Sequence, residues 1–479
     1  MTILEALKDE VLHLIQPTDT ENLKLNEVFI FLKEKLQECA NKLNISPSFI
    51  QNHGSTGIKQ THLRGASDLD IFVGLNPSDY TKWIKLPWKQ RKTALKSLFL
   101  SYVNNWFIPA SQAAGFNIFQ LSYAEHPYLI LSEKGYEIDI VGCFDLDLDY
   151  LLTHGPITAV DRTPWHSKII AERLTNNQKQ DVRLLKAFFQ SNFVYGDKQT
   201  LGRLGFTGFS AEILILYFQN LETVFSKFKD LYKNPLDFFK RSPDLLRRKS
   251  RFQKDFLIII DPVDENRNLA ASISERAYEY ARFQIQHFQQ SLSVQFFIKN
   301  PPSPIDPTFL SCPLPNFGFV EFISDGTIHY TELRDKLYSA CEKLRKLLEK
   351  EETGEERFGN TYYEVYFDEK TFVAVFYCTF SSISPTYSRR GPPKIRDTNV
   401  QTFCEKHPDA FYKNGFYYAS MTREFTESLA LISHYFHKSK PIKGLILSNI
   451  SNHAESMVGQ QALSLMINCV LPLYQVKFP

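Results

Sequence analysis

The feature that most constrains this chain is a short run, residues 67–73, in which acidic and apolar side chains alternate: Ser-Asp-Leu-Asp-Ile-Phe-Val. Successive side chains of a β-strand point to opposite faces, so a strand here would pack one face on a core. That face carries Leu69, Ile71 and Val73. Asp68 and Asp70 share the other face, roughly 6–7 Å apart along the strand. Two carboxylates at this spacing can converge on divalent cations, and Mg²⁺ prefers such oxygen ligands.

Two further segments favour a catalytic site over a solvated strand end. Gly54 and Ser55 lie upstream in a predicted loop, where the glycine allows close backbone approach and the serine hydroxyl can donate to a phosphate. Downstream, residues 136–141 read as a second strand that carries Asp139 between β-branched residues. A third carboxylate on a neighbouring strand would complete a site for two metal ions, the arrangement that phosphoryl transfer uses.

The pattern of elements predicts an α+β multidomain protein. The 479 residues are enough for two to four domains of ordinary size. Helical and strand-like patterns alternate over residues 1–155, helical spacing dominates residues 156–272, and residues 273–479 mix both. Gly391-Pro392-Pro393 lies within residues 389–396, where we expect regular structure to be broken.

Charge and cysteine content exclude several classes of protein. There are 55 basic and 53 acidic residues, a net charge of +2, so any nucleic acid must bind a local basic surface. Seven cysteines occur without C-x-x-C spacing, which argues against a zinc ribbon and indicates reduced, mostly buried thiols. Residues 1–10 do not resemble a signal peptide, and no apolar stretch of about 18 residues could cross a membrane. We expect a cytoplasmic protein.

Several separate stretches resemble those of archaeal-type (class I) CCA-adding enzymes, which are tRNA nucleotidyltransferases of the DNA polymerase beta superfamily. Gly54-Ser55 followed by residues 67–70 is similar to the superfamily signature. The narrower resemblance is carried by residues 160–166, 182–186, 194–196, 205–212 and 261–268. Their order and spacing agree with the family from about Gly54 to Ala271, and Gly391-Pro392-Pro393 is similar to a weaker landmark.

The resemblance implies a fold and a set of roles. The fold would be a nucleotidyltransferase palm with a mixed sheet (1–155), a helical neck (156–272) and an α+β body and tail that bind tRNA (273–479). The metal ligands and catalytic acids would be Asp68, Asp70 and Asp139, the first of which is often Glu in the family. The nucleotide-binding residues would be Gly54, Ser55, Lys59, His166, Lys186, Tyr195 and Arg267. Of these, His166, Lys186 and Tyr195 would grip the triphosphate, and Arg267 would read the incoming base.

Four of these residues also have an ordinary structural explanation. Lys186 could be a solvated helix lysine, Tyr195 a packing ring, His166 a capping or surface histidine, and Arg267 the ion-pair partner of Asp261 or Asp264. Lys59 matches less closely, because the loop that carries it is slightly longer than in some members of the family.

Two basic clusters are predicted RNA contacts. The first lies within Arg241–Lys254 and contains Arg247, Arg248, Lys249 and Arg251; the second contains Arg390 and Lys394. Neutralising phosphates supplies most sequence-independent affinity for nucleic acid, and A-form RNA is recognised largely through its backbone. An ordinary solvated face would look the same in the sequence.

Together these observations predict template-independent addition of C, C and A to the 3′ end of tRNA. The substrates would be CTP, ATP and the tRNA 3′ end and acceptor arm, with two Mg²⁺ ions as cofactors and no membrane partner. The alternatives are a poly(A)-type, A-only or C-only enzyme of the same superfamily, or a catalytically inactive RNA-binding module. The sequence leaves a homodimer open.

Overall fold

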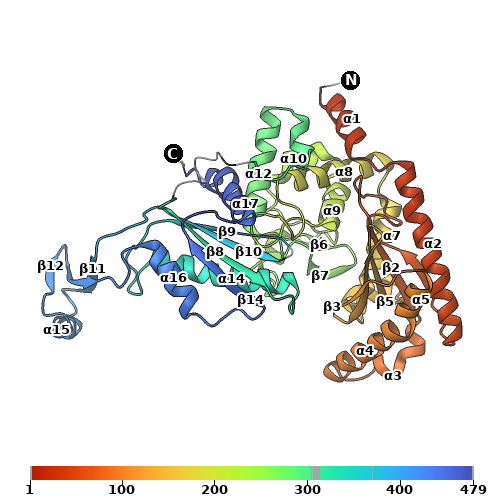
Figure 1. Ribbon diagram of the computed structural model, residues 1–479, viewed down its shortest axis with the longest axis horizontal. Coiled ribbons are helices and arrows are strands. Elements are labelled where there is room, and N and C mark those ends of the chain that lie inside the picture. Colours follow the sequence, from red (N-terminus) through yellow and green to blue (C-terminus); the bar gives the residue numbers. More distant parts are fainter. Residues whose placement is uncertain (1–2, 124, 304, 306–312, 369, 477–479) are drawn as a thin grey trace. The chain divides into compact units, whose positions relative to one another are not determined.

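A computed structural model of the protein describes residues 3–123, 125–303, 305, 313–368 and 370–476 (Figure 1). The chain divides into two compact units. Unit 1 consists of Met1–Asn192, Phe206–Ile273 and Gln284–Lys299. Unit 2 consists of Phe193–Gly205, Ser274–Phe283 and Asn300–Pro479. Both combine helices with sheets, which confirms the predicted α+β multidomain class.

Unit 1 contains a five-stranded mixed sheet in the order β1-β2-β5-β4-β3. Its strands are β1 (Phe49–Asn52), β2 (Asp68–Leu75), β3 (Phe119–Tyr123), β4 (Pro127–Glu133) and β5 (Tyr136–Phe144). Only the central pair, β2 and β5, is parallel; the other neighbours are antiparallel. The strand runs predicted at residues 69–73 and 136–141 are therefore confirmed.

Helices cover the apolar face of this sheet (Figure 1). They are α2 (Asp19–Lys42), α3 (Thr81–Ile84), α4 (Trp88–Tyr102) and α5 (Ile108–Ala113), with short turns η1 (Pro77–Tyr80) and η2 (Val103–Phe107). A capping box between Thr18 and Glu21 starts α2. Leu69, Ile71 and Val73 of β2 are almost completely buried in this core. The opposite face of β2 is thus free to present its acids.

The rest of unit 1 is mainly helical. It contains α1 (Ile3–Ile15), α6 (Leu148–His154), η3 (Ala159–Arg162), α7 (Thr163–Arg173), α8 (Asn176–Ser191), α9 (Gly208–Phe218), α10 (Leu221–Phe228), α11 (Pro243–Arg248), η4 (Val294–Phe297) and a β6–β7 hairpin (Ile260–Asp261, Asp264–Asn268). Helices α8 and α9 pack on each other, and residues 210–216 of α9 are buried. Helix α12 (Glu275–Gln290) contributes residues to both units.

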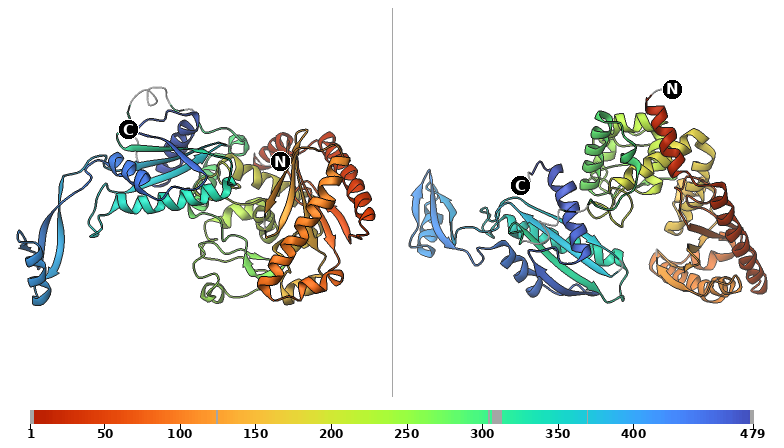
Figure 2. Two further views of the ribbon diagram at one scale, coloured as in Figure 1. Left: turned by 60° about the horizontal axis from the view of Figure 1, so that its bottom comes forward. Right: turned by 45° about the horizontal axis from the view of Figure 1, so that its top comes forward.

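Unit 2 is built on an antiparallel sheet, whose strands are teal to blue in Figure 2. The order of the strands is β14-β8-β10-β9. The strands are β8 (Phe317–Ser324), β9 (Thr361–Phe367), β10 (Thr371–Cys378) and β14 (Leu445–Ser451). Helices α14 (Tyr330–Glu349) and α16 (Ser428–Lys438) share one hydrophobic core with this sheet. Helix α17 (Met457–Leu465) contacts β9 and β10 and is followed by η5 (Met466–Val470) and α18 (Leu471–Leu473).

A smaller sheet in unit 2 corrects one prediction. Residues 389–396 were expected to break regular structure, but β11 runs from Thr386 to Pro393 and pairs with β13 (Phe416–Thr422), which also pairs with β12 (Phe411–Lys413). The prolines are tolerated because β11 is an edge strand whose register shifts between Arg390 and Pro393. Helix α15 (Asp397–Lys406) packs on β11.

Cysteines and hydrophobic helices were searched within the described ranges. Six cysteines there are free thiols, and four of them are buried, in line with the prediction; Cys312 lies outside the described residues. None of the described helices combines the length and the apolar character needed to cross a membrane.

Candidate active site

The predicted acidic residues meet on two neighbouring strands of unit 1. In the parallel pair of β2 and β5, Asp70 lies directly opposite Asp139, and Asp68 lies opposite Glu137. Ile138, on the other face of β5, is fully buried in the core. The alternation of both strands therefore gathers four carboxylates on the face that points away from this core.

The electrostatics of this face favour a cation. Burial raises the pKa of Asp70; Asp68 and Glu212 raise it further, while Lys59 lowers it. The pKa of Asp139 rises to about 7 because of burial and the neighbouring charges of Asp70 and Glu137. Carboxylates that repel one another in a poorly solvated position gain most from a metal ion that neutralises them.

The loop after β1 brings backbone close to these acids. Gly54 has φ +49°, and a Cβ at this position would lie 1.7 Å from Asp70 Oδ2. The main-chain N–H of His53 donates to the Asp70 carbonyl at 2.8 Å, and the Asn52 side-chain oxygen accepts from the Asp70 N–H at 3.2 Å. Ser55 follows directly, and its carbonyl accepts from the N–H of Thr61 at 3.0 Å.

The two lysines predicted to bind the nucleotide share one buried glutamate. Lys59 Nζ lies 3.0 Å from Glu212 Oε2, and Lys186 Nζ lies 2.9 Å from Glu212 Oε1. The Thr61 hydroxyl donates to Glu212 Oε1 at 2.6 Å, and Lys186 also donates to the Thr61 carbonyl. Lys186 is only 2% exposed, so its interpretation as a solvated helix lysine is wrong. Two cations and one anion leave a net positive charge near the carboxylates.

The charge of Glu212 is stabilised by these partners. Burial alone would raise its pKa, but Lys186, Lys59 and the Thr61 hydroxyl lower the pKa to about 2. A buried carboxylate remains ionised only when it is paired and hydrogen-bonded, and Glu212 satisfies both conditions.

A second buried carboxylate, Asp261, holds two predicted nucleotide-binding residues. His166 Nε2 lies 2.9 Å from both Asp261 oxygens, and Arg267 Nη1 lies 2.9 Å from Asp261 Oδ2. His166 is 6% exposed and its ring lies 4.3 Å from that of Phe209, so it is not a surface histidine. The ion pair that the sequence allowed for Arg267 is present, yet 43% of the arginine side chain remains exposed.

The two buried clusters act on each other electrostatically. The charge of Lys59 lowers the pKa of Asp70 and also that of His166, for which burial is the largest cause. Tyr195, the remaining predicted phosphate ligand, belongs to segment Phe193–Gly205 of unit 2. It precedes Gly196, which has φ +72°.

Some of the predicted RNA-binding residues in unit 1 form hydrogen bonds within the protein, and others are exposed to solvent. Arg247 donates to the carbonyls of Tyr232 and Asp255, and Arg251 donates to the Asn266 carbonyl at 2.7 Å. Arg248 is exposed and Lys249 half-buried.

In unit 2, the predicted RNA contacts lie beside aromatic rings. The Arg390 guanidinium lies 3.6 Å from the centre of the Phe416 ring, and Lys394 Nζ lies 5.5 Å from that of Tyr412. Both basic side chains are exposed.

The carboxylates of this face suit a magnesium ion whose other ligands come from water and from a bound substrate. Across the described ranges, no three His, Cys, Asp or Glu side chains are already close enough to share one ion. Magnesium usually takes one or two carboxylates together with waters and phosphate oxygens. Asp68, Asp70 and Asp139 supply such carboxylates, and the repulsion that raises the pKa of Asp139 would be relieved as they converge on a cation.

Glu212, Thr61 and Asp261 were not among the predicted site residues. Glu212 is the only charged residue of α9, where it is surrounded by apolar side chains, and Asp261 directly follows three isoleucines. A lone acid in a fully apolar segment indicates a buried, paired charge, so this signal was present in the sequence. Arg267 was an expected partner of Asp261, whereas His166 and the partners of Glu212 were not.

Comparison with known proteins finds relatives over most of the chain. Residues 180–298 match the family model "tRNA nucleotidyltransferase, second domain", and residues 329–452 match "CCA-adding enzyme, C-terminal domain". The CCA-adding enzyme of Pyrobaculum neutrophilum is 29% identical over 85% of this chain and 86% of its own length. That of Archaeoglobus fulgidus is 28% identical over 88% and 87%, and that of Methanocaldococcus jannaschii is 29% identical over 94% and 93%. Over most of its length the chain is therefore similar to archaeal CCA-adding enzymes, which are tRNA nucleotidyltransferases.

Proposed function

We propose that this protein is cytoplasmic and adds C, C and A in turn to the 3′ end of tRNA, using CTP and ATP and no nucleic-acid template. The observation that carries most weight is the parallel register that sets Asp70 opposite Asp139, on the sheet face influenced by Lys59. Acids for cations and lysines for phosphates next to one another are what nucleotidyl transfer requires.

Asp68, Asp70 and Asp139 would hold two magnesium ions. When bound, such ions lower the pKa of an attacking hydroxyl and neutralise charge on the triphosphate and leaving pyrophosphate. Asp139 is the best candidate for positioning the 3′ hydroxyl of the tRNA, since it stands on its own strand, across from the other two acids.

Lys59, Lys186 and His166 of unit 1 would bind the triphosphate, with Ser55. Tyr195 belongs to unit 2, and its role stays a prediction from the resemblance alone. The shared Glu212 keeps both lysines in place before substrate binds, so their side-chain entropy is already lost. One carboxylate does not neutralise two ammonium groups, and the remaining positive charge favours a phosphate over a neutral ligand.

Arg267 would read the base. Asp261 engages Nη1 of its guanidinium, which leaves donors on the exposed part. C and A each present acceptors on the pairing edge where U and G present a donor, so a fixed fork of donors can serve the two correct bases and reject the others.

Other transferases of the superfamily are the nearest alternatives. A poly(A)-type, A-only or C-only enzyme would use the same acids, whereas the segments around Asp161 and Arg267 resemble the CCA-adding family. The carboxylate set argues against an inactive RNA-binding module. A homodimer remains to be tested by mass measurement in solution.

The test is gel-resolved incorporation of each of the four nucleotides on tRNA transcripts that end before CCA, after C and after CC. We expect C, C and A in that order with Mg²⁺, and no product from Asp70→Ala protein, which should still fold and bind tRNA. The matched control is Asp149→Ala, an exposed acid of the same unit. Addition of A only, C only or a homopolymer would replace the proposal with the corresponding alternative.

A further inference from the structure

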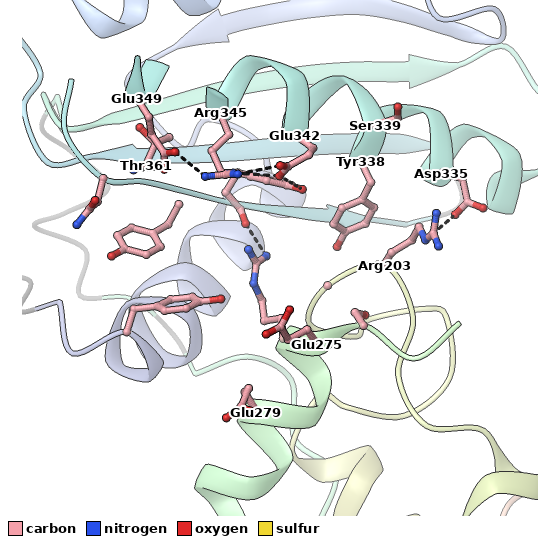
Figure 3. A pocket seen from close by; sticks show the side chains of 17 residues that line it. Arg203, Glu275, Glu279, Asp335, Tyr338, Ser339, Glu342, Arg345, Glu349 and Thr361 are labelled. Carbon is pink, nitrogen blue, oxygen red and sulfur yellow. Dashed lines mark hydrogen bonds and ion pairs between the residues drawn. The ribbon is translucent and has the colours of Figure 1, made fainter. Parts of the chain in front are cut away.

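Helix α14 borders two cavities of opposite character in unit 2. One, of about 790 Å³, is shown in Figure 3. Its acidic lining residues outnumber its arginines: Glu275, Glu279, Asp335, Glu342 and Glu349 against Arg203, Arg276 and Arg345. Several of these charges are paired, as in the bonds from Arg345 to Glu342 and Glu349. This cavity would repel a polyanion.

The other cavity, of about 740 Å³, is lined by cations alone among charged residues. It contains Lys336 and Lys343 of α14, His437 in the last turn of α16, and Lys440 just after that helix. No Asp or Glu of the described chain lines it. We call this group of four side chains the lysine cavity.

Two lysines of the lysine cavity, Lys343 and Lys440, are available to a ligand. Lys336 and Lys343 are seven residues apart, two helical turns, and so lie on one face of α14. Lys336 pairs with Glu332 at 2.6 Å. Within the described residues Lys343 and Lys440 form no ion pair, and both are exposed. His437 Nδ1 is hydrogen-bonded to the Ser433 carbonyl at 2.8 Å, and its Nε2 atom can therefore bind a ligand.

We propose that the lysine cavity binds the phosphate backbone of the tRNA. The inference rests on the proposed function. A positively charged cavity could bind RNA or an acidic protein, and the proposed tRNA substrate favours RNA. In a chain of net charge +2, a cavity with no acid in its lining is a local electrostatic feature that a polyanion would select. Lysine suits this role as a point charge for phosphate oxygens, without reading sequence.

The test measures tRNA affinity of the full-length protein as a function of potassium chloride concentration. The double variant Lys343→Gln, Lys440→Gln should bind a tRNA transcript lacking CCA about tenfold more weakly at moderate salt, with a slope of log K against log salt reduced by about 1 per lysine. Lys343→Arg with Lys440→Arg should restore both. Because these side chains are exposed, unfolding transitions should match the wild type.

The matched control is Arg203→Gln in the acid-lined cavity. Arg203 is half exposed, and its Nε lies 4.0 Å from Asp335 Oδ1. The variant therefore removes one positive charge, half of what the double variant removes, from a surface that RNA would avoid. It should leave affinity and slope unchanged. In nucleotide addition the double variant should raise KM for tRNA and keep kcat, and KM for CTP should not move.

Two results would overturn the inference. One is a double variant that binds tRNA with the same affinity and the same salt slope as the wild type. That result would mean that the cavity binds a partner other than tRNA. The other is a raised KM for CTP with unchanged tRNA affinity, which would make it a mononucleotide site. Absence of C and A addition by the wild type would instead count against the proposed function, and the binding series would still report on the cavity.

Discussion

The main chain at Gly54 lies against the carboxylate of Asp70. A Cβ on Gly54 would stand 1.7 Å from Asp70 Oδ2 and 2.7 Å from its Cγ. Real Cβ atoms do not approach other atoms so closely, and a loop backbone with φ +49° also disfavours a side chain. The glycine therefore lets the loop that we propose to bind phosphate lie next to an acid that we propose to bind metal.

Gly54→Ala should lower kcat about a hundredfold, because displacing a reacting group by about 1 Å has an effect of that order. The control is Gly135→Ala, whose φ is +80° but whose added Cβ would meet nothing within 4 Å. It carries backbone strain without the clash. Equal losses of kcat in the two variants would show that strain alone is responsible and that the contact with Asp70 is unimportant.

Metal binding should be linked to pH through Asp139, whose pKa is raised from 3.8 to about 7. In the metal-free protein the acid is largely protonated below that pH, so Mg²⁺ must displace a proton and its affinity should fall as pH drops through about 7. Calorimetry in buffers of different ionisation enthalpy would measure the released proton. Asp139→Asn should release none, and equal proton release from both proteins would contradict the assignment.

Glu212→Gln should destabilise unit 1, because two buried lysines lose their counter-charge; breaking a buried ion pair costs about 3–5 kcal/mol. The pKa of Glu212 is lowered from 4.5 to about 2, so its contribution to stability is complete above 4.5 and is lost as pH falls towards 2. Denaturant unfolding across this window should show a weaker pH dependence in the variant. An unchanged free energy of unfolding at neutral pH would rule out the buried network.

Arg267→Ala should discriminate less between CTP and UTP and should also add nucleotides more slowly. Losing a hydrogen bond to a charged group costs about 1.5–3 kcal/mol, roughly ten- to a hundredfold in rate. The measurement is the ratio of kcat/KM for CTP and UTP on tRNA lacking CCA. Arg267→Lys is the control, since it keeps a charge near Asp261 but not the fork. If kcat/KM falls equally for CTP and UTP, so that the ratio is constant, Arg267 binds phosphate or stabilises the fold and does not read the base.

The basic segment at the end of α11 should divide into two roles. Arg248 is exposed, so Arg248→Gln should weaken tRNA binding and lower its salt slope by about 1. Arg247 donates to two main-chain carbonyls, so Arg247→Gln should instead lower the free energy of unfolding by about 1–3 kcal/mol. The same salt response in both variants would mean that Arg247 is free to contact RNA despite these bonds.

Local patterns in the sequence were sufficient for much of the fold. The alternation at residues 67–73 and 136–141 identified β2 and β5 and the face of each that carries acids, because side-chain direction in a strand depends only on position along it. The sequence by itself therefore determined which acids could meet. It misjudged residues 389–393, where proline signals a break unless the strand is known to lie at an edge.

Only the tertiary structure decided how these elements combine. The pairing of β2 with β5 in parallel, with Asp70 opposite Asp139, depends on chain packing, since a one-residue slip would place the acids in the core. Lys59 and Glu212 are 153 positions apart, and whether Lys186 is solvated or buried beside them follows from the packing of α8 on α9. Such contacts are stabilised by burial and charge pairing in the folded chain, which no local pattern of residues records.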